Sequence, residues 1–127
     1  GRKLFKVHDL MHSGAELPLV TPETPMTDVV LVMTQKTFGV AGVVDSAGHL
    51  IGIVTDGDLR RHIGDNLFTL TAAGVMTKTP KFTSPKILAP EALRLMNEWK
   101  ITSVFVVDEG KPVGILRMHD ILRAGAV

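Results

Sequence analysis

The chain has 127 residues, of which 45% are hydrophobic and 21% charged, a composition typical of one compact domain or of two small repeats that share a core. Its 14 Lys and Arg and 13 Asp and Glu give a net charge of +1, so no broad positive field attracts nucleic acid or an anionic membrane, and we expect neither as a partner. The chain has no cysteine, which excludes disulfides, thiolate nucleophiles and zinc–thiolate sites and suits the reducing cytoplasm, where we expect the protein.

Hydrophobic periodicity predicts two helices and two strands in the first half of the chain, after an extended lead. Val29, Val30 and Met33 lie on one face of the first helix, and Ser46-Ala47-Gly48 is a turn between two apolar, β-branched runs. The expected elements are a helix over residues 26–36, strands over 40–45 and 50–54, and a helix over 56–63.

The second half repeats this order of elements. Ala92, Leu93 and Met96 form the matching helix face, and Pro90 suits the first turn of that helix. The further elements expected here are strands over residues 104–108 and 113–116 and a helix over 118–124.

The chain is therefore an internal duplication. Met11 recurs as Met76, 65 residues later, and three further blocks recur in the same order, 62 or 63 residues apart. The seam lies near Leu70 and divides the chain into a first repeat with its N-terminal linker, residues 1–69, and a second repeat, residues 70–127. One copy of about 60 residues buries so little surface that it is only marginally stable alone. We predict an α+β fold in which two β-α-β-β-α repeats pack sheet against sheet with pseudo-twofold symmetry.

The duplication and the block Gly52-Ile53-Val54-Thr55-Asp56-Gly57-Asp58 resemble a cystathionine-β-synthase (CBS) domain pair, also called a Bateman module. Four segments are similar, more narrowly, to the C-terminal regulatory half of bacterial arabinose 5-phosphate isomerases: residues 1–4, 9–12, 55–61 and 118–125. In that family an N-terminal sugar-isomerase domain carries out the catalysis. The chain begins at Gly1 without an initiator Met, so we expect a non-catalytic piece of a longer isomerase.

The resemblance implies a regulatory module that binds one nucleotide or nucleotide sugar between its repeats, signals to the isomerase domain of the same chain and forms a homodimer. CMP-Kdo is the expected ligand. It is the activated form of 3-deoxy-D-manno-octulosonate (Kdo), the sugar that such isomerases supply to lipopolysaccharide synthesis. An adenine nucleotide, AMP or ATP, is the alternative, because adenine nucleotides are the commonest partners of CBS pairs. A second alternative is an assembly domain whose binding site is vestigial.

Thr55 and Asp58 are the first predicted binding residues. The resemblance implies that they hold the ribose, and a carboxylate is suited to accept hydrogen bonds from two vicinal hydroxyls. The same spacing also predicts a capping box, with Thr55 at the N-cap and Asp58 accepting a bond from its backbone N–H. The two roles can coexist.

The second repeat departs from this pattern, because Asp120 matches Asp58 but Arg117 stands where Thr55 stands. Either the second site no longer binds ribose, or Arg117 supplies positive charge for a phosphate or a carboxylate; we favour the second. Arg61 is the preferred anion contact in the first repeat, because Arg123 occupies the matching position.

Thr102 and Ser103 stand where some CBS pairs have the His and Arg that hold phosphates, so we expect a softer, neutral contact there, or ordinary residues at the start of a strand. His119 is either a ligand contact or a solvated histidine near a helix start. The predicted binding residues in full are Thr55, Asp58, Arg61, Thr102, Ser103, Arg117, Met118, His119 and Asp120.

The histidines and carboxylates do not predict catalysis or a metal centre. His8 and His12 have a spacing that can bind zinc on one face of a helix, but no third ligand lies nearby in the sequence. Asp56 and Asp58 are two residues apart on a helix and point away from each other. We therefore expect no catalytic residues and no metal.

Overall fold

The structure, a computed structural model, describes residues 4–125, so the first three residues of the matched segment Gly1-Arg2-Lys3-Leu4 lie outside the described residues. The chain forms two compact units. The middle unit is Pro18–Pro80, and the terminal unit consists of the residues up to Leu17 together with those from Lys81 onward.

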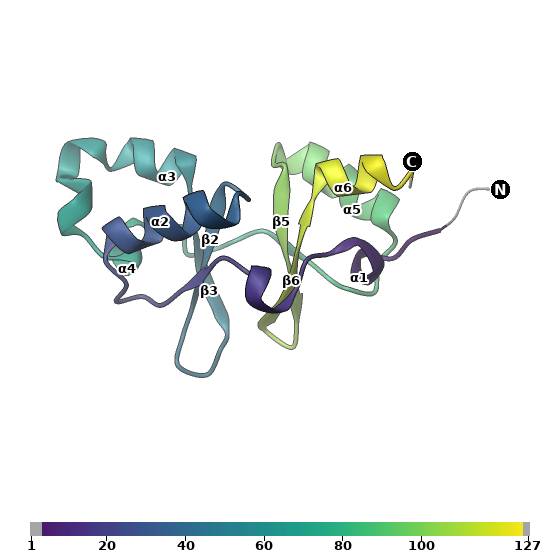
Figure 1. The fold of residues 1–127 in the computed structure, drawn as a ribbon, viewed down its shortest axis with the longest axis horizontal. Coiled ribbons are helices and arrows are strands. Elements are labelled where there is room, and N and C mark those ends of the chain that lie inside the picture. Colours follow the sequence, from purple (N-terminus) through teal and green to yellow (C-terminus); the bar gives the residue numbers. More distant parts are fainter. Residues whose placement is uncertain (1–3, 126–127) are drawn as a thin grey trace. The chain divides into compact units, whose positions relative to one another are not determined.

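The middle unit has a three-stranded sheet in the order β1-β2-β3, in which β1 and β2 are parallel and β2 and β3 antiparallel. Helix α2 contacts β1 and β2, and α3 follows β3 without a break (Figure 1). Its elements are β1 (Leu19–Val20), α2 (Met26–Lys36), β2 (Val40–Val44), β3 (Leu50–Thr55), α3 (Asp56–Arg61), the 3-10 turns Ile63–Asp65 and Leu67–Thr69, and α4 (Ala72–Val75).

The terminal unit has the same topology, with the sheet order β4-β5-β6. Helices α5 and α6 lie side by side, and α1 contacts both α5 and β6 (Figure 1). Its elements are α1 (Val7–Leu10), the 3-10 turn Gly14–Glu16, β4 (Phe82–Thr83), α5 (Ala89–Trp99), β5 (Ser103–Asp108), β6 (Lys111–Arg117) and α6 (Met118–Arg123).

The predicted α+β fold with two β-α-β-β-α repeats is confirmed, and the helix expected over residues 26–36 has those bounds. The second helix of the first repeat is shorter than predicted, because α3 ends at Arg61 and a separate 3-10 turn begins at Ile63. The helices α1 and α4 were not expected. Each has four residues, too few to show a helical period in the sequence.

The two compact units do not coincide with the sequence repeats 1–69 and 70–127. The first segment of each repeat, which we call its lead, belongs to the unit formed by the rest of the other repeat: the residues up to Leu17 belong to the terminal unit, and residues 70–80 belong to the middle unit. His12 of the first lead makes two backbone hydrogen bonds with Ile115 of β6, at 2.8 and 2.9 Å. Thr77 of the second lead makes two with Ile53 of β3, at 2.8 and 3.0 Å. The lead of each repeat therefore packs with the sheet of the other, and the division of the duplication into residues 1–69 and 70–127 stays a prediction.

Each unit has a hydrophobic core of its own. In the middle unit, buried residues of α2, the sheet and α4 form one cluster: Val20, Met26, Val29, Met33, Ala41, Val43, Val54, Leu67, Ala72 and Val75. In the terminal unit, the cluster joins α1, α5, the sheet and α6: Val7, Ala89, Ala92, Met96, Val104, Val106, Leu116 and Ile121. The packing of one sheet against the other stays a prediction. Between residues 4 and 125, no helix is long and apolar enough to cross a membrane.

Candidate functional site

The Asp58 carboxylate lies at the junction of β3 and α3 and is 2% exposed. Its Oδ2 accepts hydrogen bonds from the backbone N–H of Thr55, at 2.9 Å, and from the Thr55 hydroxyl, at 3.0 Å. Its Oδ1 accepts one from the Thr77 hydroxyl, at 2.8 Å, and one from Arg61 Nη2. We call Thr55, Asp58, Arg61 and Thr77 the Asp58 cluster.

The capping box predicted at Thr55 and Asp58 is confirmed. The Thr55 hydroxyl accepts a bond from the Asp58 backbone N–H, at 3.3 Å, while the Asp58 carboxylate accepts the Thr55 N–H. The two residues thereby satisfy backbone donors that the first turn of α3 leaves unpaired. The cap also fixes the carboxylate in one orientation at the end of β3.

The cluster keeps Asp58 ionised. Burial alone raises the pKa of this carboxyl, but the hydrogen bonds from the Thr55 backbone, Thr77, Arg61 and the Thr55 hydroxyl together outweigh it, so the pKa lies below its usual value. Asp58 is therefore a buried anion near neutral pH, as a carboxylate that accepts ribose hydroxyls would have to be.

Sequence reasoning missed Thr77, although the duplication contains the signal for it. Thr77 follows Met76, as His12 follows Met11, so the two residues occupy equivalent positions. Because each lead pairs with the last strand of a sheet, both residues arrive beside the carboxylate that follows that strand. Thr77 lies beside Asp58 only because the leads are exchanged, and no local sequence pattern shows this exchange.

The terminal unit has an equivalent cluster around Asp120, with different partners. Arg117 donates from Nε to Oδ2, at 3.0 Å, and from Nη2 to Oδ1, at 3.3 Å. The His12 ring lies between two carboxylates, with Nε2 2.7 Å from Asp120 Oδ2 and Nδ1 3.4 Å from Glu16 Oε1. We call Asp120, Arg117, His12 and Glu16 the Asp120 cluster.

Asp120 is less buried than Asp58, with 15% of its side chain exposed. Burial raises the pKa of this carboxyl, but the hydrogen bonds and the charges of Arg117 and His12 lower it by more, so the pKa again lies below its usual value. The equivalent carboxylate is thus held by two hydroxyls, a backbone N–H and a guanidinium in one unit, and by a guanidinium and an imidazole in the other.

The other predicted residues of the second repeat meet where β5 begins and β6 ends. Ser103 pairs with Arg117 in the sheet, and the carbonyl of Thr102 accepts the backbone N–H of Met118, at 2.9 Å. Met118 packs against the core of the terminal unit, and His119 is exposed. Six of the predicted residues therefore gather in the terminal unit and three in the middle unit; their union in one site stays a prediction.

The helical zinc spacing considered for His8 and His12 does not occur, because α1 ends at Leu10 and His12 lies beyond it. Across the described part of the chain, no three His, Asp or Glu side chains are grouped to hold a metal ion.

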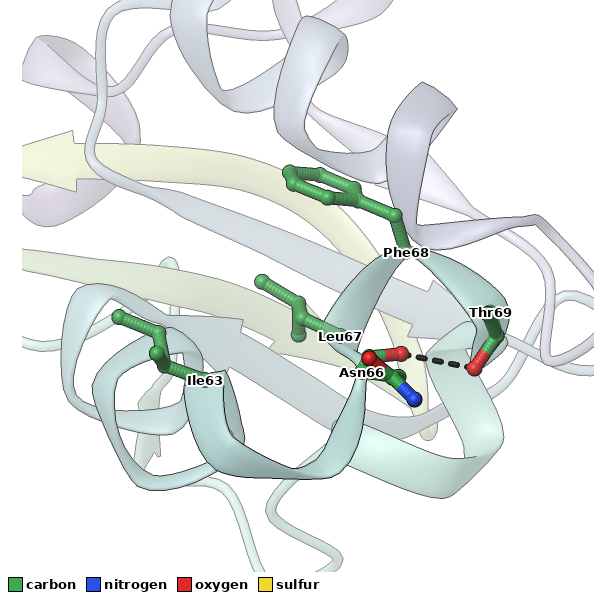
Figure 2. A pocket seen from close by; sticks show the side chains of 5 residues that line it. All are labelled: Ile63, Asn66, Leu67, Phe68 and Thr69. Carbon is green, nitrogen blue, oxygen red and sulfur yellow. Dashed lines mark hydrogen bonds between the residues drawn. The ribbon is translucent and has the colours of Figure 1, made fainter.

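A surface pocket of about 270 Å³, which the sequence did not predict, lies after α3 (Figure 2). Ile63, Leu67 and Phe68 supply its apolar lining, and the Thr69 hydroxyl donates to the Asn66 carbonyl at 2.7 Å. Ile63 and Phe68 are 67% and 60% exposed. None of the predicted binding residues lines this pocket.

Known proteins resemble this chain over almost its full length. Arabinose 5-phosphate isomerase KdsD of Pseudomonas aeruginosa is 46% identical in an alignment of 129 positions that covers 99% of this chain and 40% of that protein. The protein of Escherichia coli K12 with the same name is 45% identical in an alignment of 130 positions that covers 100% of this chain and 40% of that protein. The chain thus spans about two fifths of the length of these curated relatives.

The fold also matches solved structures. The crystal structure of CBSX2 in complex with AMP has a TM-score of 0.82 and 27% identity, and the match covers 95% of this chain and 96% of that chain. The structure of CBSX2 from Arabidopsis thaliana has a TM-score of 0.83 and 26% identity, covering 97% of this chain and 95% of that one. Residues 7–65 and 72–127 each match the model of the CBS domain. The chain therefore belongs to the CBS domain family and carries two CBS domains in tandem.

Proposed function

We propose that this CBS pair is a regulatory, non-catalytic module that binds a nucleotide or nucleotide sugar and controls a sugar-phosphate isomerase acting on D-arabinose 5-phosphate. The observation that carries the proposal is the likeness over 95% of the chain to CBSX2, whose structure contains AMP. The identity of 45% and 46% to two isomerases supports the choice of the regulated enzyme. The cysteine-free composition supports a cytoplasmic location.

In this proposal Thr55 and Asp58 hold the ribose. The Asp58 carboxylate is buried, ionised and fixed by the helix cap, so accepting ribose hydroxyls needs no reorientation of the backbone. The charged part of the ligand would meet the remaining predicted residues: Arg61, Thr102, Ser103, Arg117, Met118, His119 and Asp120.

The proposed ligand is CMP-Kdo, with an adenine nucleotide as the second candidate. CMP-Kdo carries a phosphate and a sugar carboxylate, and the predicted residues include two arginines, each suited to bind either group. The AMP bound to CBSX2 favours the adenine nucleotide. Arg117 already donates two hydrogen bonds to Asp120. In this proposal the same guanidinium also contacts the phosphate or the carboxylate of the ligand.

The ligand regulates the isomerase by binding one arrangement of the module more tightly than another. The attached isomerase domain and a second copy of the module, in a homodimer, are the proposed partners that respond. The size of the effect is limited to the difference in ligand affinity between the two arrangements.

Thermal unfolding of the 127-residue chain with CMP-Kdo, AMP and ATP tests the proposal. A ligand at 100 times its Kd adds about 2.7 kcal/mol to the free energy of unfolding, which is readily measured. In calorimetry we expect CMP-Kdo to bind at least about tenfold more tightly than AMP, a difference of about 1.4 kcal/mol. Equal or weaker binding of CMP-Kdo would favour the adenine nucleotide, and no response to any nucleotide would favour an assembly domain with a vestigial site.

Asp58→Asn is the matched variant for this experiment. It keeps the size of the side chain and one carbonyl acceptor but removes the charge. We expect it to fold and to bind the nucleotide about 1.5–3 kcal/mol more weakly, the range for hydrogen bonds to charged groups. An unchanged affinity with a slightly lower melting temperature would limit Asp58 to the helix cap and contradict its role in binding.

A further inference from the structure

The hydrogen bonds of Asp58 leave no place for a ligand. A carboxylate has about four lone-pair sites, two on each oxygen. In this structure Asp58 accepts four hydrogen bonds, two from Thr55, one from Thr77 and one from Arg61. Two vicinal ribose hydroxyls need two of these places, so two of the four donors have to turn away when a nucleotide binds.

The four donors differ in how easily they leave. The backbone N–H of Thr55 belongs to the cap of α3 and cannot turn. The Thr77 hydroxyl can rotate its proton, but its oxygen stays beside Asp58 Oδ1, because the two backbone bonds between Thr77 and Ile53 fix the segment that carries it. The Thr55 hydroxyl can rotate its proton toward a ligand while its oxygen still accepts the Asp58 N–H. The remaining donor is Arg61.

Arg61 is the donor that leaves most easily. Its side chain is 64% exposed, against 3% for Asp58, so water can solvate its guanidinium when it leaves the carboxylate. It reaches Asp58 over Gly57, where an added Cβ would lie 3.4 Å from Arg61 Nη1. In the terminal unit His119 occupies the position of Gly57. The guanidinium that binds Asp120 there belongs to Arg117 and not to Arg123, the residue that matches Arg61.

We infer that Arg61 is an exchangeable partner of Asp58, which occupies the ribose place in the empty module and turns to the anionic group of the ligand when a nucleotide binds. The inference rests on the proposed function. It makes Arg61 the residue that sets specificity for phosphorylated ligands. Arg61 competes with the ribose of every ligand for Asp58. When Arg61 leaves Asp58, its ion pair with that carboxylate is lost, and only a ligand with an anionic group can form a new ion pair with Arg61.

Calorimetry of the 127-residue chain with two matched ligand pairs, adenosine with AMP and cytidine with CMP, tests this inference. In Arg61→Gln we expect the nucleosides to bind about threefold or more tightly, because their competitor is lost. The preference for monophosphate over nucleoside should fall at least about tenfold. Arg60→Gln removes the same charge one residue away, at an exposed position, and should change both affinities less than about twofold.

Arg61→Lys distinguishes the loss of the positive charge at residue 61 from a failure of the variant to fold. It keeps a cation at residue 61, so it should keep the monophosphate preference within about threefold of the unchanged chain, even where Arg61→Gln does not fold. An unchanged preference in Arg61→Gln, or an equal weakening of nucleoside and monophosphate, would overturn the inference while leaving the proposed function intact. A wild-type chain that binds none of these four ligands and no CMP-Kdo would overturn both.

Discussion

At the scale of single residues, comparison of the two repeats identifies a buried polar side chain that lowers the free energy of unfolding. Thr83 of β4 is 5% exposed, and its hydroxyl has no hydrogen-bond partner among residues 4–125. The matching residue of the first repeat is Val20, which is 6% exposed and belongs to the core of the middle unit. A buried hydroxyl without a partner costs about 1–3 kcal/mol.

We therefore expect Thr83→Val to raise the free energy of unfolding by about 1–3 kcal/mol, because valine has nearly the same shape and no group to desolvate. Urea unfolding at neutral pH measures the change. Val20→Thr is the reciprocal control and should lower the free energy of unfolding by a similar amount. A loss of stability in Thr83→Val would show that the hydroxyl does bind a partner.

At the scale of elements, the exchanged leads depend on two glycines. A Cβ on Gly52 of β3 would lie 2.6 Å from Met76 Sδ and 3.0 Å from the carbonyl oxygen of Thr77. Gly114 of β6 has the same relation to Met11 and His12. A strand glycine is thus required wherever a lead crosses the sheet, and the recurrence of the Gly–Met pair reflects this close approach.

Gly52→Ala should lower the free energy of unfolding by about 1–3 kcal/mol, the usual cost of overpacking, because the backbone of the lead has to move. The same shift moves Thr77 away from Asp58. Gly74→Ala, on α4, is the control: its Cβ would meet only Leu70, at 3.9 Å, and alanine is about 0.5–1 kcal/mol better than glycine within a helix. Equal effects of the two variants in urea unfolding would contradict the role of Gly52.

The repeat order, the helices over residues 26–36 and 89–99 and the cap at Thr55 were predictable, because periodicity, capping residues and duplication are local patterns. The exchange of the leads was not predictable in this way. It depends on pairing between segments such as Thr77 and Ile53, which have no sequence signature for a partner. For the same reason only Thr55 was predicted as a partner of Asp58, because it lies in the same local motif. Thr77 and His12 arrive beside Asp58 and Asp120 from a distant segment, and Arg117, expected to contact the ligand, binds Asp120.

At the scale of the whole molecule, the two units have the same arrangement of elements but different side chains around the equivalent carboxylates. Each places a carboxylate after the last strand of its sheet and brings a lead residue to it. The Asp58 cluster has hydroxyls and an exposed arginine as partners, so part of it can be exchanged for a ligand. The Asp120 cluster has Arg117 on both carboxylate oxygens and His12 on one, which ties the lead to α6 through a side-chain hydrogen bond.

Both clusters also make the stability of the chain depend on pH in the acid range. The pKa values of Asp58 and Asp120 are lowered in the folded chain below the value of about 3.9 in an unfolded one. A carboxyl with a depressed folded pKa contributes stability that is fully present above the unfolded pKa and is lost as the pH falls through the folded pKa. We therefore expect the free energy of unfolding to fall below about pH 4.

Thr77→Val separates the contribution of Asp58 from general acid effects. It removes one of the hydrogen bonds that lower the pKa of Asp58, so the folded pKa moves back toward the unfolded value and the stability gained above pH 4 shrinks. Urea unfolding should show a loss of about 1.5–3 kcal/mol at pH 6, and this loss should shrink as the pH falls toward the lowered pKa of the folded chain, where the carboxyl takes up a proton. Thr79→Val changes an exposed threonine of the same segment and should leave the profile unchanged. A loss that stays the same at every pH would mean that Thr77 acts through packing, since the hydrogen bond to the carboxylate weakens when the carboxylate is protonated.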